Sequence, residues 1–175
     1  MEQKDSGLLA DVVIPRGVRL TILGLEGMKT LLQDRSVLSP RFDAVISIND
    51  VPGSLAENQS AVLFRRSVLK LADRVLYLEF EDVEDSSLRD APQLRDVLQL
   101  QLIADRLPEN AQVLLHCRAG ISRSTAAAMI LLERLGLSPE QSFAAVKAVR
   151  SCADPNELML KLARSTSRST FNEGL

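Results

Sequence analysis

The apolar positions along the chain follow two different periods, and the places where the period changes predict the secondary structure. Short apolar runs of strand type stand at residues 18–23, 44–48, 75–80 and 113–116. An earlier mixed run, 8–14, stops at Pro15, which fits an edge strand or an extended lead-in. The chain therefore offers four strands and a candidate fifth at an edge.

Helical spacing fills the segments between and after these strands. Apolar stripes predict helices over residues 25–32, about 90–107, 124–135, 138–150 and onward from 157. Two pairs that end in proline, 138–139 and 154–155, are typical of helix starts. Residues 54–73 have an interrupted helical spacing and stay ambiguous.

Strands that alternate with helices, followed by one strand and three helices, predict a single α/β domain. Its centre is a mostly parallel sheet of about four to five strands with helices on both faces. A length of 175 residues and 46% apolar content suit one core of this kind. We expect flexible ends at 1–7 and 165–175 around a domain that covers 8–164.

Composition narrows the range of partners and sites. The net charge of −2 and a pI near 5.5 disfavour nucleic acid as a main partner. The polar N-terminus predicts neither a secretory signal nor a membrane span, so we expect a cytoplasmic protein. Two cysteines and one histidine form no disulfide scaffold and no zinc site unaided, while a carboxylate metal site stays open.

The strongest chemical signal is the stretch from Val113 to Ser124, in which an apolar strand ends at Cys117. A loop containing Gly120 follows, and then an almost wholly apolar helix. Successive backbone N–H groups and a helix N-terminus stabilise negative charge, so this arrangement favours a thiolate and binds an anion. A Cys-His proton relay fails, because His116 is adjacent to Cys117 and strand neighbours point to opposite faces.

An inert buried thiol is the alternative interpretation of Cys117. It leaves Arg123 unexplained, whose guanidinium would return over the same loop and grip a tetrahedral oxyanion at two points. The strand before the loop, the glycine within it and the helix after it make a chance pairing of the two residues improbable. The stretch therefore predicts a nucleophile inside a phosphate-binding loop.

These residues resemble a known family. The run from His116-Cys117 to Arg123-Ser124 is similar to the signature of cysteine-dependent tyrosine and dual-specificity phosphatases, which is His-Cys, five residues, then Arg-Ser/Thr. The similarity to small stand-alone bacterial members extends over roughly residues 74–162. The resemblance implies a phosphotyrosine protein phosphatase-like fold and a hydrolase that needs no metal or cofactor.

The resemblance also implies roles for single residues. Cys117 would attack phosphorus to form a cysteinyl-phosphate, and Ser124 would assist its release. His116 would support the loop from behind. The phosphate would be bound by the Arg123 guanidinium and by the backbone N–H groups of the P-loop residues Arg118, Ala119, Gly120, Ile121, Ser122 and Arg123.

The family further requires an aspartic acid that protonates the leaving oxygen. The acidic loop after the strand at 75–80 supplies candidates, and Asp82 fits best because an apolar strand precedes it and an apolar residue follows. Asp85 is the alternative acid. A solvated acidic loop with no role in catalysis is the other interpretation.

Phosphotyrosine in proteins is the expected substrate, with phosphoserine and phosphothreonine as an open extension. An inositol phosphate or other small phosphate ester hydrolysed by the same mechanism stays open, as does a non-catalytic phosphate-binding module. Phosphate, sulfate or vanadate would occupy the site as ligands. Cys152 is a candidate partner for a protective disulfide with oxidised Cys117, and Arg118 is either a selector of anionic substrates or a solvated side chain.

Overall fold

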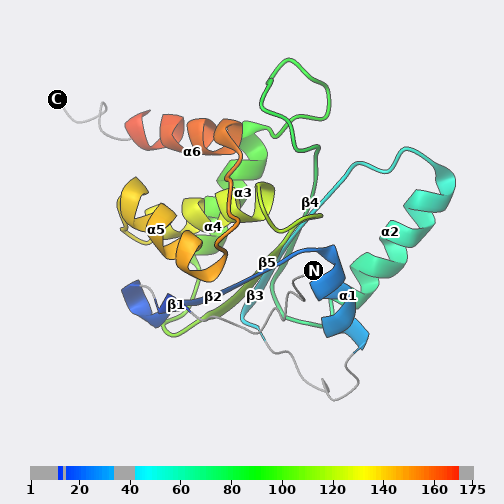
Figure 1. Ribbon diagram of the computed structural model, residues 1–175, viewed down its shortest axis with the longest axis horizontal. Coiled ribbons are helices and arrows are strands. Elements are labelled where there is room, and N and C mark those ends of the chain that lie inside the picture. Colours follow the sequence, from blue (N-terminus) through cyan, green and yellow to red (C-terminus); the bar gives the residue numbers. More distant parts are fainter. Residues whose placement is uncertain (1–11, 14, 34–41, 170–175) are drawn as a thin grey trace, which may run out of the picture.

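A computed structural model describes residues 12–13, 15–33 and 42–169. Its centre is a sheet of five strands in the order β1-β2-β5-β3-β4 (Figure 1). The strands are β1 (Val12–Val13), β2 (Arg19–Leu23), β3 (Ala44–Asn49), β4 (Val75–Glu79) and β5 (Gln112–His116). All neighbours pair in parallel except β1, which is antiparallel to β2 at the edge. The predicted mostly parallel sheet is confirmed.

Helices cover both faces of the sheet (Figure 1). They are α1 (Leu25–Gln33), α2 (Leu55–Val68), α3 (Leu94–Asp105), α4 (Arg123–Arg134), α5 (Pro139–Val149) and α6 (Glu157–Ser169), with a short 3-10 turn, η1, at Pro15–Gly17. Helices α3 to α6 pack together on one face, and α1 and α2 lie on the other. The single α/β domain expected from the alternation of periods is therefore present.

The alternation of side chains along the central strand builds one core on each face. Val113 and Leu115 of β5 belong to the larger core, which also contains most of helix α4, buried from Arg123 to Leu132. Leu114 points the other way, into a smaller core with Met28 of α1 and Val68 of α2. Because both faces are covered, β5 is apolar at successive positions, as expected of a central parallel strand. Cys117 follows directly on β5, at its carboxyl end.

Helix α3 begins later than predicted, and the ambiguous segment 54–73 contains a helix. The segment 54–73 contains α2, which begins with the Ser54 side chain accepting from the Glu57 N–H at 3.2 Å. Helix α3 begins at Leu94 rather than near residue 90, because the Asp90 carbonyl accepts from the Glu81 N–H at 2.7 Å and Pro92 follows. Asp90 is thereby held in the preceding connection.

The C-terminal boundary at 164 was set too early. Helix α6 continues through Ser169, so residues 165–169 are helical and do not belong to a loose tail. The polar composition of this segment gives no sign of its contact with α3. The side-chain amide of Gln101 donates to the Thr166 hydroxyl at 3.0 Å. The rest of the expected tail, 170–175, and the expected flexible start, 1–7, lie outside the described residues.

Among the described residues, no helix is both long enough and apolar enough to cross a membrane.

Candidate active site

The P-loop, residues 117–123, joins the end of β5 to the start of α4 and closes around the thiol of Cys117. Cys117 is 2% exposed, and its Sγ lies 3.2 Å from the Oγ of Ser124. The backbone N–H of Gly120 donates to the same sulfur at 3.2 Å. A buried thiol in contact with a hydroxyl and an amide donor is placed to carry negative charge.

Four consecutive carbonyl groups of the P-loop, those of residues 118–121, are held from outside it. Leu25 N–H donates to the Arg118 carbonyl at 2.9 Å, and Asp154 N–H donates to the Ile121 carbonyl at 2.9 Å. Between them, the Arg150 side chain donates to the carbonyls of Ala119 and Gly120, at 3.1 and 3.0 Å. The described peptides are all trans, so each N–H points away from the preceding carbonyl. The amides that follow these carbonyls are therefore turned toward the inside of the loop.

Gly120 is required by a close approach of two backbones. Its φ of 69° lies in the left-handed region, and a Cβ there would stand 2.7 Å from Gly24 N and 2.8 Å from Leu23 C. The end of β2 thus packs directly on the P-loop. Gly24 is equally constrained, because a Cβ at that position would meet the Ala119 carbonyl oxygen at 2.9 Å. A side chain at either glycine would push the loop off the sheet.

Arg123, the first residue of α4, is buried with its guanidinium returned over the loop. One terminal nitrogen donates to the Phe80 carbonyl at 2.6 Å, and the other donates to Asp50 Oδ1 at 2.6 Å. Its Nε is buried and, within the described residues, has no hydrogen-bond partner; it lies 4.0 Å from Asp82 Oδ2. An arginine fixed at two points with a third donor free is prepared to bind an oxyanion.

His116 and Cys117 point to opposite sides of β5. The His116 Nε2 lies 2.7 Å from Ser47 Oγ, and the ring packs edge-on against Phe64 of α2, with ring centres 5.5 Å apart. Burial lowers the pKa of His116 to about 4, so the imidazole is neutral at pH 7. Its observed contacts are those of a neutral support beneath the strand end.

Asp82 is tied to the P-loop from the connection between β4 and α3. Its Oδ1 accepts from the Ser122 hydroxyl at 2.7 Å and from the Asn156 side-chain amide at 3.0 Å. Asn156 is 1% exposed, and its amide also donates to the Val83 carbonyl at 3.2 Å. Asp82, although 39% exposed, is thus held beside Arg123 by two donors.

Asp85 occupies a different environment. Its side chain is exposed and accepts from the hydroxyl and the backbone N–H of Ser87, at 2.7 and 2.9 Å. These hydrogen bonds lower the pKa of Asp85 below its ordinary value, which is opposite to what a proton donor needs. Of the two aspartates, Asp82 is the one that a hydrogen bond joins to the P-loop.

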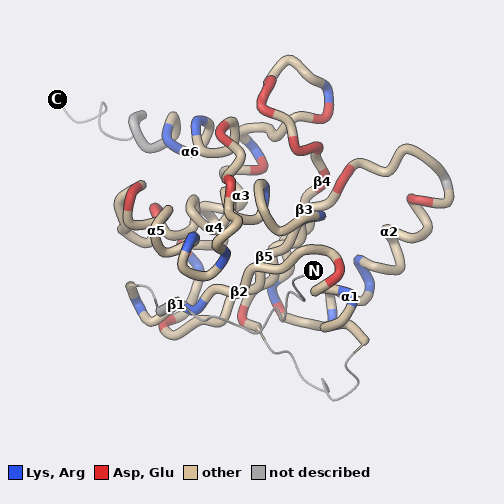
Figure 2. The backbone as a smooth tube through the Cα atoms, in the orientation of Figure 1, with Lys and Arg blue, Asp and Glu red and all other residues tan. Residues whose placement is uncertain are grey.

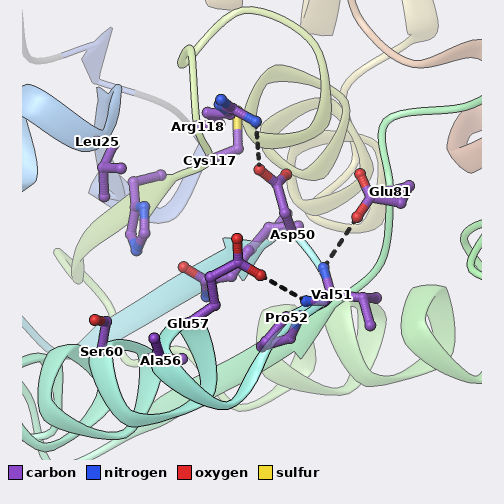
Figure 3. A pocket seen from close by; sticks show the side chains of 15 residues that line it. Leu25, Asp50, Val51, Pro52, Ala56, Glu57, Ser60, Glu81, Cys117 and Arg118 are labelled. Atoms are coloured by element: carbon purple, nitrogen blue, oxygen red, sulfur yellow. Dashed lines mark hydrogen bonds and ion pairs between the residues drawn. The ribbon is translucent and has the colours of Figure 1, made fainter.

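A pocket of about 700 Å³ opens above Cys117 (Figure 3). Apolar side chains line part of it, among them Leu25, Pro52 and Ala56. The other part carries charged residues from three segments: Asp50, Glu57, Glu81 and Arg118. Arg118 is paired with Asp50 at 3.0 Å. No group of three or more histidine, cysteine or acidic side chains among the described residues is placed to hold a metal ion.

Three residues at the site escaped the sequence interpretation. They are Asp50, Arg150 and Asn156, none of which is among the candidate site residues that the sequence indicates. A signal existed for Asp50, because it follows the buried strand β3, and parallel strands place their carboxyl ends at one edge of the sheet. No comparable signal marked Arg150 or Asn156.

Cys152 is exposed and is not bonded to Cys117, so the protective disulfide stays a prediction.

No protein-family model and no curated protein matches this chain. Solved structures do share its fold. The human tyrosine phosphatase-like serine/threonine/tyrosine-interacting protein is 21% identical, with a TM-score of 0.64, over 92% of this chain and 97% of that protein. Human DUSP28 is 17% identical, with a TM-score of 0.60, over 91% and 93%. PTPMT1, in complex with PI(5)P, is 21% identical, with a TM-score of 0.52, over 88% and 95%.

The chain therefore shares the fold of these phosphatase and phosphatase-like structures. This confirms the fold that the signature from His116 to Ser124 implied. One of the similar structures is described only as phosphatase-like, so the fold leaves activity to be argued from the site.

Proposed function

We propose that this protein is a metal-independent phosphomonoesterase that hydrolyses phosphotyrosine through a cysteinyl-phosphate intermediate. The observation that carries the proposal is the setting of Cys117. Its sulfur lies within 3.2 Å of a hydroxyl and an amide donor, inside a loop whose amides turn inward and at the base of an open pocket. A structural cysteine needs none of these features.

In the first step, the thiolate of Cys117 attacks phosphorus in line with the ester oxygen. The sulfur–phosphorus bond forms as the phosphorus–oxygen bond breaks, and the leaving oxygen takes a proton from Asp82. The inward amides and the Nε of Arg123 stabilise the charge on the remaining phosphoryl oxygens. The products are the free alcohol or phenol and the cysteinyl-phosphate.

In the second step, water attacks the cysteinyl-phosphate and gives up a proton to the Asp82 carboxylate. The sulfur–phosphorus bond breaks, and the Ser124 hydroxyl, 3.2 Å from the sulfur, donates to the thiolate that leaves. Inorganic phosphate departs and the enzyme returns to its starting state. Asp82 thus acts first as an acid and then as a base.

The pocket supports an aromatic phosphate ester as substrate. Its volume of about 700 Å³ exceeds what a phosphate alone fills, and pockets for small ligands span roughly 300–1,000 Å³. Leu25 and Pro52 offer apolar surface to a phenol ring above the thiol. Phosphoserine and phosphothreonine reach the same thiol with less apolar contact, so we place them second. The expected cytoplasmic location stays a prediction.

The deciding experiment is hydrolysis of 4-nitrophenyl phosphate in the presence of a chelator. We expect turnover by the wild type and none above background by Cys117→Ser. A wild type without turnover would overturn the enzyme assignment and leave the non-catalytic phosphate-binding module. An active Cys117→Ser would show that another group is the nucleophile. Cys152→Ser is the matched control and should keep the wild-type rate, because Cys152 is exposed and outside the loop.

A further inference from the structure

Beyond the thiol and its loop, the pocket carries an excess of fixed negative charge. Three carboxylates line it, from Asp50, Glu57 and Glu81, against one guanidinium, from Arg118. In Figure 3 the Asp50 side chain points toward Arg118 and Cys117, with Glu57 and Glu81 on either side of it. Figure 2 shows the same acidic character along the connections that enter α2 and leave β4. A site that only needed to attract phosphate would not be lined by more carboxylates than cations.

The single cation of the pocket lining is already neutralised. Asp50 accepts from Arg118 at 3.0 Å through Oδ2 and from Arg123 at 2.6 Å through Oδ1. Arg118, the first residue after the nucleophile, is therefore not a free selector of anionic substrates. The charges of Glu57 and Glu81 have no such partner in the pocket lining, and they set its net sign.

The two glutamates are held in place by the backbone of the loop between β3 and α2. Glu57 Oε2 accepts from the Gly53 N–H at 2.7 Å, and Glu81 Oε1 accepts from the Val51 N–H at 3.1 Å. Within the part of the chain that the structure describes, the second oxygen of each carboxylate has no hydrogen-bond partner. We call Glu57 and Glu81 the wall of the pocket. Each of these two carboxylates is fixed through one oxygen and has its other oxygen free for a donor on a ligand.

The three carboxylates surround the pocket without converging on one point. Asp50 lies in the connection between β3 and α2, Glu57 in the first turn of α2, and Glu81 in the connection after β4. No three acidic, histidine or cysteine side chains of the described residues are grouped as a metal site would require. Separate anions around one opening suit an extended ligand with several cationic groups better than a small molecule with one.

We propose that the carboxylates of Glu57 and Glu81 select phosphotyrosine peptides whose neighbouring residues are lysine or arginine. The inference rests on the proposed function. The inward amides and Arg123 bind the phosphate at the base of the pocket, and the wall binds ammonium or guanidinium groups of the flanking chain. The same wall repels a second phosphate beside the first, so it disfavours multiply phosphorylated inositol lipids.

The test uses three peptides that share a central phosphotyrosine and differ only in the flanking residues, which are lysine, alanine or glutamate. We expect kcat/KM for the lysine peptide to exceed that for the glutamate peptide by roughly tenfold or more at low salt, and the ratio to shrink as salt screens the charges. The variant with Glu57→Gln and Glu81→Gln should bring the ratio close to that at high salt. Glutamine keeps the carbonyl oxygen that Gly53 and Val51 bind, so the wall stays in place.

Glu109→Gln is the matched control, because Glu109 is exposed and lies before the opposite end of β5. It removes the same charge and should leave the ratio of the two peptides unchanged. The affinities of the peptides for Cys117→Ser give the same preference without turnover. A loss of preference in Glu109→Gln as large as in the wall variant would overturn the proposal, since the effect would then be one of overall charge.

The outcomes separate this inference from the function on which it rests. Equal rates on all three peptides overturn the selection by the wall and leave the phosphotyrosine phosphatase intact. If neither a peptide nor 4-nitrophenyl phosphate is hydrolysed, the proposed function is overturned. If the three peptides also bind Cys117→Ser with equal affinity, the selection by Glu57 and Glu81 is overturned as well. Faster hydrolysis of phosphoethanolamine than of the lysine peptide would assign the wall to small amines. Faster hydrolysis of phosphoinositide vesicles would contradict it outright.

Discussion

The P-loop and the acidic loop, residues 81–85, supply the two halves of the candidate site, and they are built in different ways. The P-loop lies between the central strand and a helix buried on nearly every face, and its carbonyls are held from three directions. The acidic loop is largely exposed, and Asp82 is fixed by Ser122, Asn156 and a long ion pair. The core thus fixes the shape of the P-loop, which forms the anion cradle, whereas Asp82 is held beside the P-loop only by side-chain contacts.

This difference predicts which substrates a mutation in each half of the site should affect. A change in the cradle removes charge stabilisation that every phosphate ester needs. A change at the acid removes only a proton, which matters most when the leaving oxygen is a poor leaving group. The two halves can therefore be separated by comparing substrates with good and poor leaving groups. The stability of the cradle is measured separately.

The largest effect is expected for Arg123→Lys, which keeps the buried charge and loses the planar donors. We expect kcat on 4-nitrophenyl phosphate to fall by about 10³-fold, because removal of one oriented donor to a developing oxyanion costs roughly that much. Arg134→Lys is the control, since Arg134 makes an exposed ion pair with Asp105 far from the loop. A fall of less than tenfold would mean that the cradle binds phosphate mainly through its amides.

Asp82→Asn should show the leaving-group dependence. We expect about a 10²-fold fall in kcat for alkyl phosphates and a much smaller fall for 4-nitrophenyl phosphate, whose phenolate leaves without help. Asp85→Asn is the matched control and should change neither rate appreciably. The assignment of the acid would move to Asp85 if that variant, and not Asp82→Asn, lost the alkyl substrates.

His116 makes the stability of the cradle depend on pH. Its pKa is about 4 in the folded protein and near 6.5 when unfolded, so the unfolded chain binds the extra proton between these values. The stability is present above pH 6.5 and is lost as the pH falls toward 4. We expect His116 to account for a loss of about 2 kcal/mol in the free energy of unfolding between pH 7 and pH 5, measured with urea.

His116→Gln is the comparison for that measurement. Glutamine offers an amide to Ser47 and does not titrate, so the difference between the two pH values should shrink by the same amount. An equal pH dependence in the variant and the wild type would show that other groups carry it.

The smallest effect is expected for Asn156→Asp, which tests the attachment of the acid. Aspartate keeps the oxygen that caps α6 through the Met159 N–H at 3.1 Å, but it replaces the donor to Asp82 by a second carboxylate. We expect kcat for alkyl phosphates to fall by about tenfold, with a steeper dependence on the leaving group. An unchanged dependence, with only a lower melting temperature, would reduce Asn156 to a helix cap.

Much of the cradle could be predicted because its parts are close together in the chain. Cys117, Gly120 and Arg123 lie within seven residues, between a predicted strand and a predicted helix, and each predicted element is present. Local periodicity and backbone chemistry were sufficient for the strand, the turn and the helix. The same reasoning failed for residues 165–169, since a polar composition says nothing of a partner such as Gln101 on another helix.

The wall and the attachment of the acid could not be predicted, because they depend on contacts between distant parts of the chain. Asp50 reaches Arg123 only because β3 and β5 are neighbours, although α2, β4 and α3 lie between them in the sequence. Asn156 contacts Asp82 although α3, β5, α4 and α5 lie between them in the sequence. No local period reports such pairs.

The sequence by itself therefore determined the elements, the sheet class and the short loop that holds Cys117 and Arg123, because strands, helices and a seven-residue loop are governed by near neighbours. Tertiary structure alone decided the order of the strands, and with it which carboxylates surround the thiol. Asp50 and Glu81 line the same pocket as Cys117 because they follow β3 and β4, and parallel strands bring their carboxyl ends to one edge.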